Sequence, residues 1–365
     1  MPVLEKIVIS DFRNIRLQEV EFAPNVNCIS GNNGEGKTNL LDAIYYLSMT
    51  KSAFASSDRF NFRHGTDEFS IAGSYRMDNG LVSRFALKMT SKGEKKVKRD
   101  DKPYTRISEH VGVLPVVMVS PADISLVSES GEERRRFVNS VLSQMDHEYL
   151  SALQQYNRLL LQRNRMLKDL EVDRALLEVI DMRMAALAQP VYERRRDFVE
   201  RLKPVVSEYY RILSGGSEQV GIEYESDLSK AGLDTLLASS FEKDRVLKYT
   251  TCGVQRDDFI FTMNGHPIRR HGSQGQQKSF LVALKFAQYE IMKLDYGFAP
   301  LLLLDDVFDK LDMNRVSNLL QMVASKDFGQ IFITDSNKVR MSGIVDSLTS
   351  DRAYFETVGG TFERI

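Results

Sequence analysis

The chain has 365 residues, of which 42% are hydrophobic and 27% are charged. These proportions are ordinary for a globular protein and exclude a wholly disordered chain, and the length suffices for a large core or two domains. The net charge of −1 excludes nucleic-acid binding through bulk positive charge, so any basic binding surface requires local clustering.

The sequence carries no targeting or membrane signal. Charge appears at Glu5 and Lys6, where the apolar part of a signal peptide would begin. No apolar run approaches the ~18 residues that cross a bilayer. Cys28 and Cys252 form no metal-binding spacing and fit a reducing compartment. We therefore expect a cytoplasmic protein with no membrane partner.

The N-terminal part of the chain predicts strands, a glycine-rich loop and a helix. Residues 3–9, 19–22 and 26–30 are predicted strands, and the third is short and apolar. Gly31–Thr38 follows it with the pattern G-x-x-x-x-G-K-T. Residues 37–49 then show one apolar face at helical spacing. This order of strand, loop and helix makes the pattern a predicted phosphate-binding loop (P-loop).

The predicted P-loop has a defined chemistry. Its glycines permit backbone conformations that point N–H groups at phosphates, reinforced by the start of the helix. We expect Lys37 to reach the β- and γ-phosphates of ATP and the Thr38 hydroxyl to ligate Mg²⁺. Arg13 and Asn14, after the first strand, are predicted to lie near the nucleotide, and a surface ion pair is the alternative for Arg13.

The middle of the chain changes from β to helical character. Residues 69–77 and 81–89 flank the turn at 78–80 and predict a hairpin, and residues 116–119 predict a buried strand. Residues 131–213 show helical spacing with a turn near 171–173. We expect an α/β fold whose nucleotide-binding sheet is split by a helical lobe, with domains 1–130, 131–249 and 250–365.

The last third of the chain predicts alternating strands and helices. The expected strands are 259–263, 301–304 and 330–334, and the expected helices are 276–294 and 314–324. The strand at 301–304 is a run of four leucines followed by Asp305 and Asp306. We expect Asp305 to hold Mg²⁺ and Asp306 to position or activate the attacking water, and a solvent-facing acidic turn is the alternative.

A glutamine-rich segment lies about 30 residues before this acidic strand. Ser273-Gln274-Gly275-Gln276-Gln277-Lys278 begins a predicted helix with a capping residue and a glycine. Capping alone would explain these residues. Its position before the acidic strand resembles that of a segment in head-to-tail ATPase dimers, and this resemblance implies that it offers a helix N-terminus to the γ-phosphate bound by the opposite subunit.

Two basic clusters are candidates for contact with nucleic acid. Residues 84–106 contain nine Lys and Arg against three Asp and Glu, a net charge of +6. The helical lobe contains a second cluster of nine arginines: Arg134, Arg135, Arg136, Arg158, Arg163, Arg165, Arg194, Arg195 and Arg196. Such clusters suit phosphate contacts, and a solvated charged face is the alternative for each.

These motifs together resemble the RecF family of bacterial recombination-repair ATPases within the ABC/SMC superfamily, over essentially the whole chain. The resemblance rests on residues 10–14, 31–48, 119–124, 133–137, 256–258, 272–278 and 303–307. It implies an ABC-type P-loop ATPase head, ATP-dependent dimerisation on DNA, slow DNA-dependent ATP hydrolysis and action at single-strand gaps. It also implies cooperation with RecR and RecO in loading RecA.

The resemblance implies which residues form the site. The expected catalytic residues are Lys37, Asp305 and Asp306, and the expected metal ligands are Thr38 and Asp305. The expected nucleotide-binding residues are Gly31, Asn32, Asn33, Gly34, Glu35, Gly36, Lys37, Thr38, Asn39, Arg13, Asn14, Ser273, Gly275 and Gln276.

Some positions depart from the family pattern. Lys310, within 309–312, reverses a charge expected near the dimer seam, and Gly253-Val254-Gln255 stands where the family carries Gly-Pro-His. Thr334-Asp335 stands where related ATPases often carry a switch histidine.

Three other function classes fit parts of the sequence. The P-loop and acidic strand suit the ATP-binding subunit of a transporter, but the helical insertion and the glutamine-rich segment do not. An ATPase of an anti-phage nuclease system would carry a further catalytic domain, for which the residues after Thr334 leave no room. A purely structural DNA-bridging protein would need long coiled-coil arms, and residues 131–213 are too few to form them.

Overall fold

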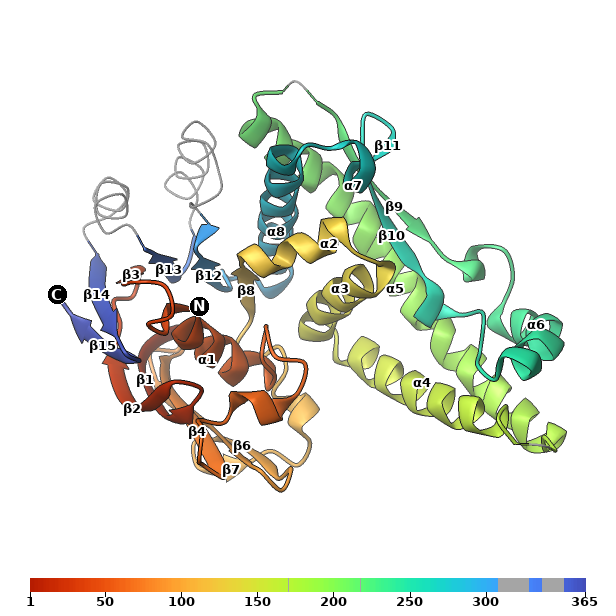
Figure 1. Cartoon of the computed structure of the whole chain (residues 1–365), viewed down its shortest axis with the longest axis horizontal. Helices are drawn as coiled ribbons and strands as arrows, with labels where there is room; N and C mark the ends of the chain where they lie inside the picture. The colour runs from red at the N-terminus through yellow and green to blue at the C-terminus, as the bar shows by residue number, and fades with distance from the viewer. Residues whose placement is uncertain (170, 217, 308–327, 337–350) are drawn as a thin grey trace. The chain divides into compact units, whose positions relative to one another are not determined.

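The computed structural model describes residues 1–169, 171–216, 218–307, 328–336 and 351–365. These residues form two compact units (Figure 1). Unit 1 comprises Met1–Ile124, Ile212–Gly216 and Gln274–Ile365, and unit 2 comprises Ser125–Arg211 and Ser217–Ser273.

Unit 1 contains a mainly parallel sheet in the order β15-β14-β3-β13-β12-β8. Every residue of β3, β8, β12 and β13 is buried, as expected for strands of a parallel sheet covered on both faces. Parallel pairing aligns Ser30 with Asp335 and Thr334 with Asp305, so these strands end at the same edge. The strands are β3 (Val26–Ser30), β8 (Val116–Val119), β12 (Leu301–Asp305), β13 (Ile331–Asp335), β14 (Arg352–Val358) and the antiparallel β15 (Thr361–Arg364).

A second, antiparallel sheet of unit 1 has the order β2-β1-β4-β5-β6-β7. Alternating burial along β4 and β5 gives it one buried and one outer face. The buried face packs on helix α1 (Lys37–Met49), where the ring of Tyr46 lies 5.4 Å from that of Phe69. The strands are β1 (Val3–Phe12), β2 (Ile15–Glu21), β4 (Glu68–Arg76), β5 (Val82–Thr90), β6 (Lys95–Arg99) and β7 (Lys102–Pro103).

Unit 2 is mainly helical and carries a three-stranded sheet in the order β11-β10-β9. Buried ion pairs join its elements: Arg163 contacts Asp244 at 2.7 Å and Arg195 contacts Asp257 at 2.5 Å. Its elements are α2 (Ser125–Ser128), α3 (Gly131–Met145), α4 (His147–Met166), α5 (Arg174–Ser214), β9 (Val220–Glu225), α6 (Leu233–Leu247), β10 (Asp258–Met263), β11 (His266–Pro267) and α7 (Ile268–His271). The C-terminal end of α5 lies in unit 1.

Most predicted elements are present close to their expected bounds. Helix α8 (Gln274–Tyr296) extends the helix predicted at 276–294, and the hairpin predicted around 78–80 is formed by β4 and β5. The elements that were not predicted include strands β6, β7, β9, β11, β14 and β15 and helix α6. Short 3-10 helices occupy Asp58–Asn61, Ile107–Glu109, Pro121–Ile124, Asp227–Ser229 and Val254–Arg256.

The division into units differs from the predicted one at its second boundary. Residues 250–273, assigned above to the ATPase domain, lie in unit 2 because β10 pairs with β9 and not with the parallel sheet. The helix predicted at 314–324 and residues 309–312 lie outside the described residues. Within the described part of the chain, no helix combines the length and apolarity that crossing a membrane requires.

Candidate nucleotide site

The predicted P-loop connects β3 to α1, as the sequence pattern requires. Gly36 caps α1 in the left-handed region, with φ at 110°, and a Cβ there would lie 2.8 Å from the Asn14 side chain. Only glycine fits this combination of conformation and close approach without strain. The helix therefore begins directly after the loop, with its first N–H groups unsatisfied by the helix itself.

Lys37 is held against the loop. Its side chain is almost fully buried, with 4% relative exposure. Its ammonium donates hydrogen bonds to the carbonyls of Gly31 at 2.7 Å and Asn32 at 3.0 Å. The positive charge of Lys37 therefore lies at the loop's concave backbone, where the phosphates of a nucleotide bind in loops of this kind.

The acidic strand meets the first turn of α1. The Thr38 hydroxyl donates to both carboxylate oxygens of Asp305, at 3.0 Å each. Thr334, at the end of β13, donates to Oδ1 of Asp305 at 2.7 Å. Asp305 therefore accepts hydrogen bonds from hydroxyl groups on two elements. The fold brings Thr38 and Asp305 together although they are 267 residues apart in the sequence.

Burial raises the pKa of the Asp305 carboxyl above its ordinary value. The hydrogen bonds from Thr334 and Thr38 and the charge of Lys37 oppose this rise, because they favour the ionised form. A cation bound beside Asp305 would favour the same ionised form.

Asp306 follows the strand in the left-handed region, with φ at 45°. Its N–H donates to the Thr334 hydroxyl at 3.0 Å and to the Thr334 carbonyl at 3.3 Å. Asp and Asn tolerate this conformation better than most residues because their short polar side chains make local hydrogen bonds. Thr334 therefore contacts both members of the acidic pair, through the side chain of Asp305 and the backbone of Asp306.

Arg13 forms a partly buried ion pair. Its guanidinium lies 2.7 Å from Oδ2 of Asp42 on α1, and the Asp42 side chain is fully buried. Arg13 also donates to Oδ1 of Asn39 at 3.0 Å, and Asn39 donates to Oδ1 of Asn14 at 2.7 Å. The predicted residues Arg13, Asn14 and Asn39 thus form one chain of contacts beside the loop. Asp42, their internal partner, was not predicted.

The β14–β15 hairpin also contacts the loop. The Glu35 carbonyl accepts hydrogen bonds from the Gly360 N–H at 2.8 Å and from the Thr357 hydroxyl at 3.2 Å. The Glu35 carboxylate accepts from the Gly359 N–H. These contacts were not predicted from the sequence, although Gly359-Gly360 between Val358 and Thr361 is a hairpin signal.

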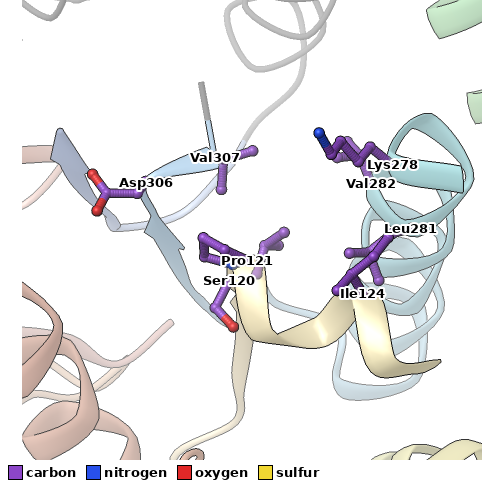
Figure 2. A pocket seen from close by; sticks show the side chains of 9 residues that line it. Ser120, Pro121, Ile124, Lys278, Leu281, Val282, Asp306 and Val307 are labelled. Atoms are coloured by element: carbon purple, nitrogen blue, oxygen red, sulfur yellow. The ribbon is translucent and has the colours of Figure 1, made fainter. Parts of the chain in front are cut away.

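The glutamine-rich segment lies at the beginning of α8. Gly275 and Gln276 belong to its first turn, and Ser273 directly precedes the helix. Lys278, one turn further, lines a pocket with the residues that follow β8 and β12. Figure 2 shows Lys278 directed from α8 into this pocket, whereas the Asp306 carboxylate is directed away from α8. The pocket is otherwise lined by Val119, Ser120, Pro121, Ile124, Leu281, Val282, Asp306 and Val307.

The residues at the loop fit a magnesium nucleotide. A hydroxyl and a carboxylate oxygen lie 3.0 Å apart at Thr38 and Asp305, and Mg²⁺ prefers oxygen ligands. In phosphate-transfer sites, Mg²⁺ is held by one or two such protein oxygens together with the phosphates. The loop backbone, the beginning of α1 and Lys37 supply the donors that phosphates require.

Comparison with known proteins identifies the family. Residues 3–351 match the model of the RecF/RecN/SMC N-terminal domain. The chain is 44% identical over 358 residues to the DNA replication and repair protein RecF of Parabacteroides distasonis, covering 98% of each chain. It is 40% identical over 349 residues to the RecF of Flavobacterium johnsoniae, covering 94% of this chain and 97% of that protein.

Solved structures show the same relationship. The structure described as the recombination mediator protein RecF with ATP in the RecFOR pathway matches with a TM-score of 0.90 and 29% identity, over 100% of this chain and 98% of that one. The Smc head domain of Pyrococcus furiosus, at 17% identity, matches with a TM-score of 0.59, which supports the fold alone. The fold is therefore that of an ABC-type ATPase head, and the chain belongs to the RecF family of DNA replication and repair proteins.

Proposed function

We propose that this chain is an ATP-dependent DNA clamp of recombinational repair and replication-fork maintenance. In this proposal it dimerises on ATP at single-strand gaps and helps to load RecA. The observation that supports it most is the contact between the P-loop helix and the acidic strand, at Thr38 and Asp305, in a chain whose full-length relatives are RecF proteins.

The site residues receive the following roles in this proposal. Lys37 and the backbone N–H groups of residues 31–38 bind the phosphates of ATP. Thr38 and Asp305 hold Mg²⁺, which when bound would neutralise charge that develops on the phosphates. Asp306 orients the attacking water and accepts its proton. Arg13, Asn14 and Asn39 position the loop and line the nucleotide site.

The second half of each site comes from the partner subunit in this proposal. Ser273, Gly275 and Gln276 lie at the beginning of α8, a long helix whose N-terminus attracts anions. Facing the γ-phosphate bound by another copy, these residues would join two subunits only when ATP is present. Binding and hydrolysis of ATP would then control whether the chain is a dimer or a monomer.

Slow hydrolysis suits such a switch. Thr334-Asp335 stands where related ATPases often carry a switch histidine, and the Thr334 hydroxyl donates to Asp305. A threonine hydroxyl with its proton committed to a carboxylate is a poor general base. We therefore expect weak ATPase activity that resets the clamp and does not drive a motor.

The partners follow from the family. We propose DNA with gaps or single-strand/double-strand junctions, a second copy of the chain, and mediators of the RecR and RecO type. The solved relative is described within the RecFOR pathway, which supports this set. Since the proposed substrate is chromosomal DNA, we place the chain in the cytoplasm. The transporter and nuclease alternatives are not favoured, because the full-length relatives carry the name of a DNA replication and repair protein.

DNA affinity in defined nucleotide states tests this function. We would measure binding to a fluorescent gapped duplex by anisotropy, with ATP, with ADP and without nucleotide, for the wild type and Lys37→Ala. The proposal expects the highest affinity with ATP and no effect of ATP on the variant. Equal affinity of the wild type in all three states would overturn the ATP-dependent clamp.

A further inference from the structure

The outer face of the antiparallel sheet in unit 1 carries a cluster of cations, which we call the basic face. It consists of Arg84 and Lys88 on β5 and of Lys96 and Lys98 on β6, and all four side chains are exposed. Alternation along the strands places Phe85, Leu87 and Val97 on the opposite, buried face. The four cations therefore share one accessible surface.

The pairing of the two strands brings like charges together. Lys88 lies opposite Lys96, and Ala86 lies opposite Lys98. Directly opposed residues are about 5 Å apart, and like charges at that separation destabilise a sheet. Lys88 is compensated by Glu68 at 2.8 Å. Lys96 and Lys98 have no ion pair within the described part of the chain, so an external anion would relieve their repulsion.

The other cations of this strand pair have internal partners. Lys95 lies 2.7 Å from Asp58 and donates to the Thr50 carbonyl at 2.8 Å. Arg99 lies over the ring of Phe85 and pairs with Asp100 at 3.7 Å. Within β5 and β6, the positive charge that no carboxylate compensates therefore reaches solvent mainly through the basic face, while Lys92, Lys102 and Arg106 of the same segment are exposed outside these two strands.

The arginine cluster of unit 2 is largely neutralised. Arg134, Arg163 and Arg195 are buried and pair with Asp258, Asp244 and Asp257. Three more are exposed but pair with nearby carboxylates, namely Arg136, Arg194 and Arg196. Arg135 donates to the Asp257 carbonyl at 2.7 Å. Of the nine, Arg158 and Arg165 alone are exposed without an ion pair among the described residues.

The surroundings of the basic face indicate which form of nucleic acid it fits. All four aromatic residues of the six strands, Phe12, Phe69, Tyr75 and Phe85, are buried, so the face offers no ring on which unpaired bases could stack. The neighbouring outer positions on β4 are the small residues Ser70, Ala72 and Ser74, which leave the sheet open to close approach. Lysines on a flat surface suit the phosphates of a duplex, without reading of sequence.

We propose that the basic face binds the phosphate backbone of duplex DNA, with Lys96 and Lys98 as its main contacts. This inference rests on the proposed function and assigns the double-stranded part of a gapped substrate to this sheet.

Salt-dependent DNA binding tests the assignment. We would measure anisotropy of a labelled duplex, with ATP and Mg²⁺, over a range of salt for the wild type and for Lys96→Ala/Lys98→Ala. The double variant should bind roughly tenfold more weakly at low salt, and the slope of log affinity against log salt should fall by about 2, one for each lost phosphate contact. Lys230→Ala/Lys243→Ala, two exposed lysines of unit 2, is the matched control and should keep both values.

Each further outcome is informative. Thermal unfolding would show that the double variant remains folded. Unchanged duplex affinity and salt slope in that variant would overturn this inference and leave the proposed function standing. Loss of duplex affinity in Arg158→Ala/Arg165→Ala, but not in Lys96→Ala/Lys98→Ala, would have the same meaning. Loss of binding to phosphatidylserine vesicles, with duplex binding intact, would identify the face as a membrane surface and also overturn it. A wild type that binds no DNA with or without ATP would instead reject the proposed function.

Discussion

Thr334 and Asp305 are joined by a hydrogen bond of 2.7 Å between the ends of neighbouring parallel strands, β13 and β12. The same hydroxyl accepts from the Asp306 N–H at 3.0 Å. One buried side chain therefore fixes the carboxylate that faces Thr38 and the backbone of the residue to which we assign the attacking water. This makes Thr334 a positioning residue in the proposed reaction.

The first prediction concerns this hydroxyl. Thr334→Val keeps the shape but removes the hydrogen bonds, so Asp305 and Asp306 lose their common support. We expect ATP hydrolysis at saturating ATP to fall roughly tenfold to a hundredfold, since small misplacements of catalytic groups have effects of that size. The Mg²⁺ concentration for half-maximal ATP binding should rise. Thr334→Ser, which keeps the hydroxyl, should show wild-type hydrolysis and Mg²⁺ dependence. Equal impairment of the two variants would show that the hydroxyl does not position Asp305 and Asp306.

The second prediction concerns Asp306. Asp306→Asn retains a side chain that tolerates the left-handed conformation, with φ at 45°, but it cannot accept a proton. We expect hydrolysis to slow by about a hundredfold or more, with ATP affinity within about threefold of the wild type. Single-turnover hydrolysis and equilibrium binding of a fluorescent ATP analogue measure the two quantities. Hydrolysis at the wild-type rate would remove Asp306 from the assigned role.

The third prediction concerns the ion pair between Arg13 and Asp42. The Asp42 side chain is fully buried and also accepts from the Ser52 hydroxyl and the Ala53 N–H. Asp42→Asn leaves the Arg13 charge without its partner, which should lower the free energy of unfolding by about 3 kcal/mol. Urea denaturation measures this change, with Glu21→Gln, an exposed site, as the control. A change below about 0.5 kcal/mol would show that the ion pair contributes little to the stability of the fold.

The fourth prediction concerns pH. His110 is fully buried, its Nε2 donates to the Leu47 carbonyl at 2.7 Å, and burial lowers the pKa of its imidazole. The folded state therefore holds the neutral ring, whereas the unfolded chain takes up a proton near pH ~6.5. This residue stabilises the fold above that pH, and the contribution is lost as the pH falls toward the depressed pKa of the folded state.

His110→Gln keeps a donor for the Leu47 carbonyl but does not titrate. Its unfolding free energy should fall less steeply than that of the wild type between about pH 8 and about pH 5. Denaturation at several pH values measures the slopes, and the exposed His64→Gln should follow the wild type. Identical slopes for the wild type and His110→Gln would contradict the assigned protonation state.

The parts of the fold that the sequence predicted well are those with local signals. The bounds of β3 and α1 were predicted correctly because a short apolar run, a glycine loop and a 3.6-residue period follow each other directly. Strand β6 was missed because four of its five residues are Lys or Arg, and only Val97 is buried. Residues 95–99 form a strand because they pair with β5, and their own composition does not indicate one.

The parts of the site that the sequence did not predict depend on contacts between distant segments. Thr334 reaches Asp305 only because β12 and β13 pair in parallel with one particular register. In the sequence nothing distinguishes Asp42 from the other acidic residues. Its role appears only in the structure, where Arg13 lies 2.7 Å from it. The start of unit 2 lies near its predicted place, but its end does not, because residues 258–263 have a strand pattern that suits either sheet.

The molecular mass in solution tests the central claim most directly. We would measure light scattering of the purified protein with and without ATP, Mg²⁺ and gapped DNA, beside Lys37→Ala. The account predicts a monomer of 41.6 kDa that doubles its mass only when ATP is present, and a variant that stays monomeric. A wild-type mass that does not change with ATP would contradict the ATP-dependent clamp, although the nucleotide site itself would stand.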